Sequence, residues 1–107
     1  MVTRKAAIST VKDFLKDCLN AGLKIDKAIL FGSFVKEKQK KYSDIDLALI
    51  SEDFGKNFLK NNKLTSKINI KYPDIEVHHF NREYYYNFSD PFIDEIKQTG
   101  FEIEISK

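Results

Sequence analysis

The apolar residues near the start of the chain recur at helical spacing between residues 3 and 21. This apolar set is Ile8, Val11, Phe14, Leu15, Cys18 and Leu19. Residues three and four positions apart share one side of a helix, so the pattern predicts an amphipathic helix whose other face carries charged side chains. We expect Gly22 to end this helix, because glycine readily adopts the left-handed conformation that commonly follows a helix.

Four later segments have the pattern of strands. Residues 27–31 form a short apolar run without helical period, ended by Gly32, and predict a buried strand. Residues 44–50 alternate between polar and apolar and then become wholly apolar, which is typical of a central strand with one end at the surface. Residues 74–80 predict a third strand, and the alternation in residues 101–105 predicts a short last one.

Two further helices are expected between these strands. A weakly periodic apolar pattern after Gly55 predicts a helix that ends near residue 67, and its apolar positions are Phe58, Leu59, Leu64 and Ile68. Ser89 or Asp90 can cap a helix whose first turn contains Pro91 and which ends at Gly100. This order of elements predicts an α+β fold, with a small mixed sheet of three to four strands flanked by helices, but it does not reveal the strand order.

The composition is that of an ordinary globular protein, since 42% of the 107 residues are hydrophobic and 32% are charged. This length supports one hydrophobic core, so residues 1–107 are expected to form a single domain. The net charge of +2 gives no reason to expect nucleic acid as a direct substrate. The sequence shows neither a signal peptide nor an apolar run long enough to span a membrane, which predicts a cytoplasmic protein. Cys18 is expected to be a buried structural thiol.

Two aspartates, Asp44 and Asp46, stand at the polar end of the predicted central strand. Residues two apart on a strand project from the same face, so their carboxylates point the same way. Like charges held together repel, and a bound divalent cation offsets that repulsion. Oxygen ligands alone favour Mg²⁺ or Mn²⁺. A single pair of this kind is more often solvated at the surface, so the prediction of a metal site depends on the neighbouring motifs.

Two such motifs accompany the aspartates. Gly32 and Ser33 follow the strand at residues 27–31, where the glycine permits close backbone approach and the serine offers a hydroxyl beside free N–H groups, a combination that suits a phosphate. Asp74 and Glu76 add two carboxylates to one face of the third strand. Phosphate together with a divalent metal indicates a nucleotide substrate.

The order of these motifs resembles the minimal nucleotidyltransferases of the DNA polymerase beta superfamily. The Gly32-Ser33 pair is followed, after residues 34–43, by the sequence DIDL at residues 44–47, and this spacing lies within that family's range. The resemblance extends over nearly the whole chain, because the later sequences IEVHHF, NREYY and DPFIDEI also look like a bacterial branch of these small proteins.

The resemblance implies two Mg²⁺ ions, with Mn²⁺ as an alternative, bound by Asp44, Asp46 and a third acidic residue. Glu76 is the preferred third ligand, and it would also help to orient or deprotonate the acceptor hydroxyl. It lies between two apolar residues, whereas Asp74 follows a proline at the strand edge and suits a turn equally well.

The resemblance also implies that Gly32 and Ser33 hold the triphosphate of ATP or of another nucleoside triphosphate. The loop departs from the family at two positions: many relatives have an arginine where this chain has Phe34, and a glycine where it has Glu37. Lys36 is the expected replacement for the missing positive charge. The lysines of residues 36–41 are as consistent with solubility as with attraction of a polyanion.

Two groups of residues near these motifs leave alternatives open. His78 shares the strand face of Glu76, which allows a position near the metal ions, but a hydrogen-bonded structural histidine is the commoner case and is the preferred reading. The three tyrosines at residues 84–86 are expected in a loop, where they cover an edge of the core rather than stack on a base.

The reaction implied by the resemblance moves a nucleoside monophosphate, AMP by default, from a triphosphate to an acceptor hydroxyl with loss of pyrophosphate. At 107 residues the chain is expected to lack the extra domain with which larger relatives select an acceptor, so a partner or a second copy of the chain would complete the site. Small members of the family are commonly antitoxins encoded beside a HEPN-domain ribonuclease, and some modify a tyrosine of that toxin. Two alternatives remain: a transferase for a small molecule such as an aminoglycoside, and a non-catalytic antitoxin that only binds its toxin or a nucleotide.

Overall fold

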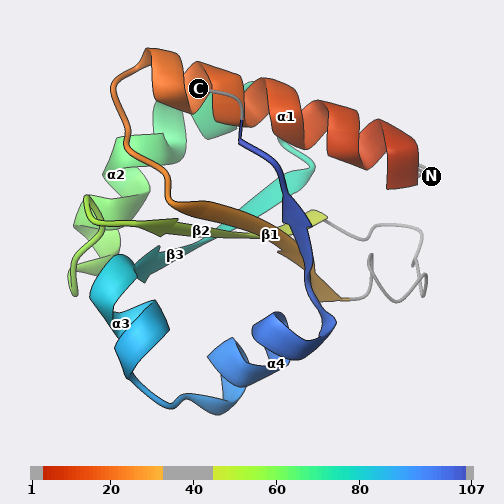
Figure 1. Ribbon diagram of the computed structural model, residues 1–107. Helices are drawn as coiled ribbons and strands as arrows, with labels where there is room; N and C mark the ends of the chain where they lie inside the picture. Colours follow the sequence, from red (N-terminus) through yellow and green to blue (C-terminus); the bar gives the residue numbers. More distant parts are fainter. Residues whose placement is uncertain (1–3, 33–44, 106–107) are drawn as a thin grey trace.

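The computed structural model describes residues 4–32 and 45–105 (Figure 1). Within these ranges the helices and strands follow one another as α1 (Arg4–Asn20), β1 (Lys27–Phe31), β2 (Ile45–Ser51), α2 (Phe58–Asn69), β3 (Ile75–Asn81), α3 (Arg82–Asn87), α4 (Pro91–Thr99) and β4 (Phe101–Ile103). Each helix and strand that the apolar pattern predicts in these ranges is present, with ends that differ by a few residues. No helix of these ranges combines the length and the apolar composition needed to cross a membrane.

The described strands form one mixed sheet in the order β3-β2-β1-β4. β1 pairs with β2 and with β4 in antiparallel fashion, whereas β2 and β3 are parallel. The parallel pair requires the chain to cross over between the two strands, and α2 provides that crossover. The predicted α+β class with a small mixed sheet is therefore confirmed, and the strand order is a new result.

Helices cover both faces of the sheet (Figure 1). α1 and α2 lie on one face, and α3 and α4 lie on the other. The sheet residues buried under α1 and α2 are Ala28, Leu30, Ile45, Leu47, Leu49, Ile75 and Ile103, and those under α3 and α4 are Ile29, Phe31, Ala48 and Ile50. β2 is thus apolar on both sides over most of its length, as its unbroken apolar run predicts.

The ends of the longer helices follow from particular residues. Gly22 comes just after α1 and has φ of +93°, a value at which glycine avoids the steric cost of a side chain. Asn57 caps α2, because its side-chain oxygen accepts a hydrogen bond from the backbone N–H of Lys60. Asp90 caps α4 in the same way, and Pro91 opens that helix as predicted.

The helix α3 was not predicted, because the tyrosines at residues 84–86 were expected in a loop. The side chain of Asn81 accepts hydrogen bonds from the backbone N–H groups of Glu83 and Tyr84 and so starts this helix at the end of β3. Six residues are too few to show a helical period. Tyr85 is buried and covers the core as expected, whereas Tyr84 and Tyr86 are exposed.

Cys18 lies in the core beneath α1, as predicted for a structural thiol. Burial, with a smaller contribution from the negative charge of Asp17, raises the pKa of the Cys18 thiol to about 12. The thiol is therefore protonated at neutral pH and unsuited to act as a nucleophile.

Candidate functional site

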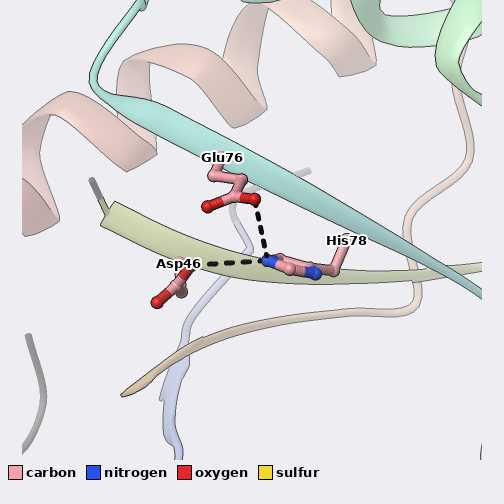
Figure 2. Close-up of side chains that lie close together, drawn as sticks. All are labelled: Asp46, Glu76 and His78. Atoms are coloured by element: carbon pink, nitrogen blue, oxygen red, sulfur yellow. Dashed lines mark hydrogen bonds and ion pairs between the residues drawn. The ribbon is translucent and has the colours of Figure 1, made fainter. Parts of the chain in front are cut away.

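Three side chains that can bind a metal ion meet on the face of the sheet that α4 covers. In the parallel pairing of β2 with β3, Asp46 lies beside Glu76, and Ala48 lies beside His78. Glu76 and His78 are two residues apart on β3, so they project from the same face. The sheet register therefore brings together an aspartate and a residue pair that are distant in the sequence (Figure 2).

One ring nitrogen of His78 faces both carboxylates of this cluster (Figure 2). This Nε2 atom lies 3.3 Å from Oδ1 of Asp46 and 4.0 Å from Oε1 of Glu76. One ligand atom from each of the three residues lies within 4.8 Å of the others. The side chains of Asp46 and His78 are about three-quarters covered, while that of Glu76 is 56% exposed. The cluster thus opens to solvent on the side of Glu76.

Gly32 closes the other side of the site, directly after β1. It has φ of +79°, and a β-carbon at this position would collide with the carboxylate of Asp46. Phe31, the residue before it, is the register partner of Asp46 on the antiparallel neighbour. Within the described residues, the group next to the backbone of Gly32 is thus the carboxylate of Asp46, and the predicted approach of a phosphate stays a prediction.

Aromatic rings surround the side chain of His78. Phe31 meets its ring edge to face with centroids 5.0 Å apart, and Phe92 of α4 does the same at 5.9 Å. Phe31 and Phe92 also contact each other, with centroids 5.4 Å apart. Contacts of this kind hold the imidazole plane in one orientation, so its Nε2 atom points at the two carboxylates.

The neighbouring His79 has a different environment, on the opposite face of β3. Its Nε2 atom forms a hydrogen bond of 2.8 Å with the hydroxyl of Thr65 in α2, and its ring packs against Phe54. Burial, followed by the proximity of His78, lowers the pKa of His79 to about 4 from the ordinary 6.5. His79 is therefore a neutral structural histidine at physiological pH.

Of the six residues predicted to form the site, the structure describes three, Gly32, Asp46 and Glu76, and these three lie together. Asp74 does not join them: it lies in the turn before β3, is exposed, and uses its backbone oxygen to accept a hydrogen bond of 2.6 Å from the N–H of Ile45. The choice of Glu76 over Asp74 as the third metal ligand stays a prediction.

The remaining predicted site residues, Ser33, Lys36 and Asp44, lie outside the described ranges, as do Phe34 and Glu37. Their proposed roles stay predictions from the sequence.

His78 was predicted to share the strand face of Glu76, with a hydrogen-bonded structural role as the preferred reading. Nε2 of His78 does form a hydrogen bond with Oδ1 of Asp46, which agrees with that reading, and it also lies near Glu76. Its distance from Asp46 depends on the register between β2 and β3, which no local pattern reveals.

A mixed four-stranded sheet that sets carboxylates from two adjacent strands beside a glycine turn has the architecture of the polymerase beta-like nucleotidyltransferases. The sequence matches the family described as "Polymerase beta, Nucleotidyltransferase" over residues 13–103. This match spans most of the chain, and the protein therefore belongs to that family.

Solved structures with the same fold are similar over most of their length. A protein from Sulfolobus solfataricus assigned as a nucleotidyltransferase superposes with a TM-score of 0.66 at 12% identity, covering 89% of this chain and 77% of that chain. A chain of a toxin–antitoxin structure with AMP-PNP gives a TM-score of 0.63 at 17% identity, with coverages of 90% and 74%. A chain from a complex of the tri-AMPylated HEPN toxin of Shewanella oneidensis with its MNT antitoxin gives 0.56 at 16%, with coverages of 89% and 70%.

At these identities the superpositions show a common fold and nothing finer. A search among curated proteins found no match to this sequence.

Proposed function

We propose that this protein transfers AMP from ATP to a hydroxyl group of a partner protein, with divalent metal ions held by Asp44, Asp46 and Glu76. The observation that carries the proposal is the register of β2 and β3, which sets Asp46 and Glu76 side by side in a protein of the nucleotidyltransferase family. Two carboxylates on neighbouring strands, with solvent on one side, suit ions that prefer oxygen ligands and must also reach a nucleotide.

The described residues fit such an ion. Asp46 and Glu76 supply carboxylate oxygens, and within the described part of the chain the imidazole of His78 faces both of them. A bound divalent ion would neutralise their mutual repulsion, lower the pKa of an acceptor hydroxyl and stabilise the charge of the departing pyrophosphate. The resemblance to the family implies Mg²⁺, with Mn²⁺ as an alternative.

The residues of the chain would divide the remaining work. Glu76, which is the more exposed carboxylate, would accept a hydrogen bond from the acceptor hydroxyl and help to remove its proton. Gly32, with no side chain between its backbone and Asp46, would allow the triphosphate to approach the metal ligands. Ser33 and Lys36 would bind the phosphates through a hydroxyl and a positive charge.

A tyrosine of a HEPN-domain toxin is the acceptor we propose, which would make the protein an antitoxin. Two solved structures of the same fold support this choice: one is a toxin–antitoxin with AMP-PNP, and the other joins an MNT antitoxin to a HEPN toxin that carries AMP groups. A partner that brings its own hydroxyl would place the acceptor at the site by binding to this protein.

The test is to purify the protein encoded by the adjacent gene, mix it with this protein, ATP and Mg²⁺, and identify modified residues by mass spectrometry. We expect an added AMP on a tyrosine of that partner, and we expect none with the Asp46→Asn variant. A tight complex whose partner stays unmodified would favour the non-catalytic antitoxin instead. Transfer of AMP to an aminoglycoside, with no transfer to the partner, would favour the small-molecule transferase.

A further inference from the structure

The imidazole of His78 lies between two carboxylates, and the hydrogen bond from its ring to Asp46 is long. A charge-assisted N–H···O bond to a carboxylate is usually about 2.7–2.9 Å long. The distance from Nε2 of His78 to Oδ1 of Asp46 is 3.3 Å, and the distance to Oε1 of Glu76 is 4.0 Å. The nitrogen therefore forms one long hydrogen bond and faces a second carboxylate oxygen that lies beyond hydrogen-bond distance.

These separations match those of atoms that share a metal ion. Two ligand atoms that each lie about 2.1 Å from one ion are about 3.0 Å apart when they subtend a right angle and about 4.2 Å apart when they are opposite each other. Both distances measured from His78 Nε2 fall between these limits. The carboxylate of Glu76 is largely exposed, so a small rotation can complete the arrangement.

The surroundings of His78 support a ligand rather than a freely moving side chain. Phe31 and Phe92 pack edge to face against its ring, and Phe31 is itself buried. A metal-binding histidine needs its ring plane fixed, and here aromatic packing supplies that restraint.

We propose that Nε2 of His78 is a direct ligand of the divalent ion bound by Asp46 and Glu76, so that this position has mixed nitrogen and oxygen ligands and prefers a first-row transition ion such as Mn²⁺ over Mg²⁺. The preference follows because imidazole nitrogen binds transition ions more strongly than it binds Mg²⁺, which selects oxygen ligands. The inference rests on the metal site of the proposed function, but it concerns the nature of the ligands rather than the reaction.

Pulsed electron paramagnetic resonance of bound Mn²⁺ tests the proposal directly, because it detects coupling to an imidazole nitrogen. The sequence contains only two histidines, His78 and His79, so protein purified without a histidine tag has only two possible sources of that signal. Inorganic tripolyphosphate can stand in for the nucleotide's phosphates, since it contributes no nitrogen. We expect the coupling in the parent protein, its loss in His78→Gln, and its retention in His79→Gln, the matched control on the opposite face of β3.

Calorimetry with Mn²⁺ and with Mg²⁺ gives a second readout. We expect His78→Gln to weaken Mn²⁺ binding by at least about tenfold and to change Mg²⁺ binding much less. If Mn²⁺ binds in a manner that Asp46→Asn abolishes, but shows no imidazole coupling, His78 is not a ligand and the metal site of the proposed function stands. If Mn²⁺ does not bind, or binds equally well to Asp46→Asn, both the ligand and the metal site are wrong.

Discussion

Asp46 of β2 and Glu76 of β3 are register partners on adjacent parallel strands, although thirty positions separate them in the sequence. Neighbouring strands lie about 4.8 Å apart, so two ionised carboxylates on the same face of such a pair repel each other. This repulsion destabilises the fold unless a positively charged group or ion binds between the two carboxylates. The pairing therefore favours a bound cation at this point of the sheet.

The double variant Asp44→Asn with Asp46→Asn is expected to bind Mg²⁺-ATP at least about a hundredfold more weakly than the parent protein, because it removes two of the proposed metal ligands. Asparagine keeps the size of aspartate, so the circular dichroism spectrum should not change. Calorimetry on both proteins measures the effect, with Asp53→Asn as a control because Asp53 lies outside the cluster, where it accepts a hydrogen bond from the N–H of Lys24. Parent-like binding by the double variant would show that the metal assignment is wrong.

Glu76→Gln should lower the rate of AMP transfer by at least about a hundredfold, the usual scale for loss of a positioned acid or base, while ATP binding largely persists. Asp74→Asn is the matched comparison, since Asp74 lies in the turn before β3, where its backbone oxygen accepts a hydrogen bond from the N–H of Ile45. We expect that variant to retain most of the activity. Single-turnover rates for the two variants decide whether Glu76 or Asp74 is the third carboxylate of the site. A larger loss of rate for Asp74→Asn than for Glu76→Gln would assign that role to Asp74.

Gly32→Ala is expected to disturb the site itself, because the new β-carbon would collide with the carboxylate of Asp46. Gly22 provides a control for backbone strain, since it also has positive φ but nothing within 4 Å of a built β-carbon. Both variants should lose about 1–2 kcal/mol of unfolding free energy from the left-handed conformation. Only Gly32→Ala should also weaken Mn²⁺ binding, by at least about tenfold. Equal Mn²⁺ binding by the two variants would contradict this prediction, because it would show that moving the carboxylate of Asp46 does not weaken the metal site.

The lowered pKa of His79 predicts a loss of stability in mild acid. The folded protein holds this histidine neutral until its pKa of about 4, whereas the unfolded chain takes up a proton near the ordinary 6.5. The unfolded state therefore binds more protons between these values, so the stability that neutral His79 confers is complete above pH 6.5 and falls as the pH drops toward 4. Because His79 is partly accessible to water, we expect this loss to be about 1–2 kcal/mol.

Urea unfolding of the parent protein and of His79→Gln, measured between pH 7 and pH 4, checks this expectation. Glutamine cannot titrate, so the unfolding free energy of His79→Gln should fall by about 1–2 kcal/mol less between pH 7 and pH 4 than that of the parent protein. Parallel curves for the two proteins would show that His79 is not the group responsible.

Much of the architecture could be read from local patterns. The apolar period of residues 3–21 corresponds to α1, and the unbroken apolar run after Asp46 corresponds to a strand buried on both faces. Asp90 and Pro91 marked the start of α4 because capping depends on side chains within one turn of the helix. The helix α3 could not be predicted, because six residues are too few to show a helical period. Its start depends on a cap that Asn81 supplies from the end of β3.

The sequence by itself determined which residues share a strand face, because the two-residue period of a strand is a local property: Glu76 and His78 had to point the same way, and Gly32 had to stand at the end of its strand. Only the tertiary structure decided that Asp46 lies beside Glu76, and that Nε2 of His78 faces them both. That arrangement depends on the register of two strands joined through α2, and the register is set by burying apolar side chains on both faces of β2 at once. No short stretch of sequence contains that information, because the energy that selects the register comes from the whole sheet and the helices packed on it.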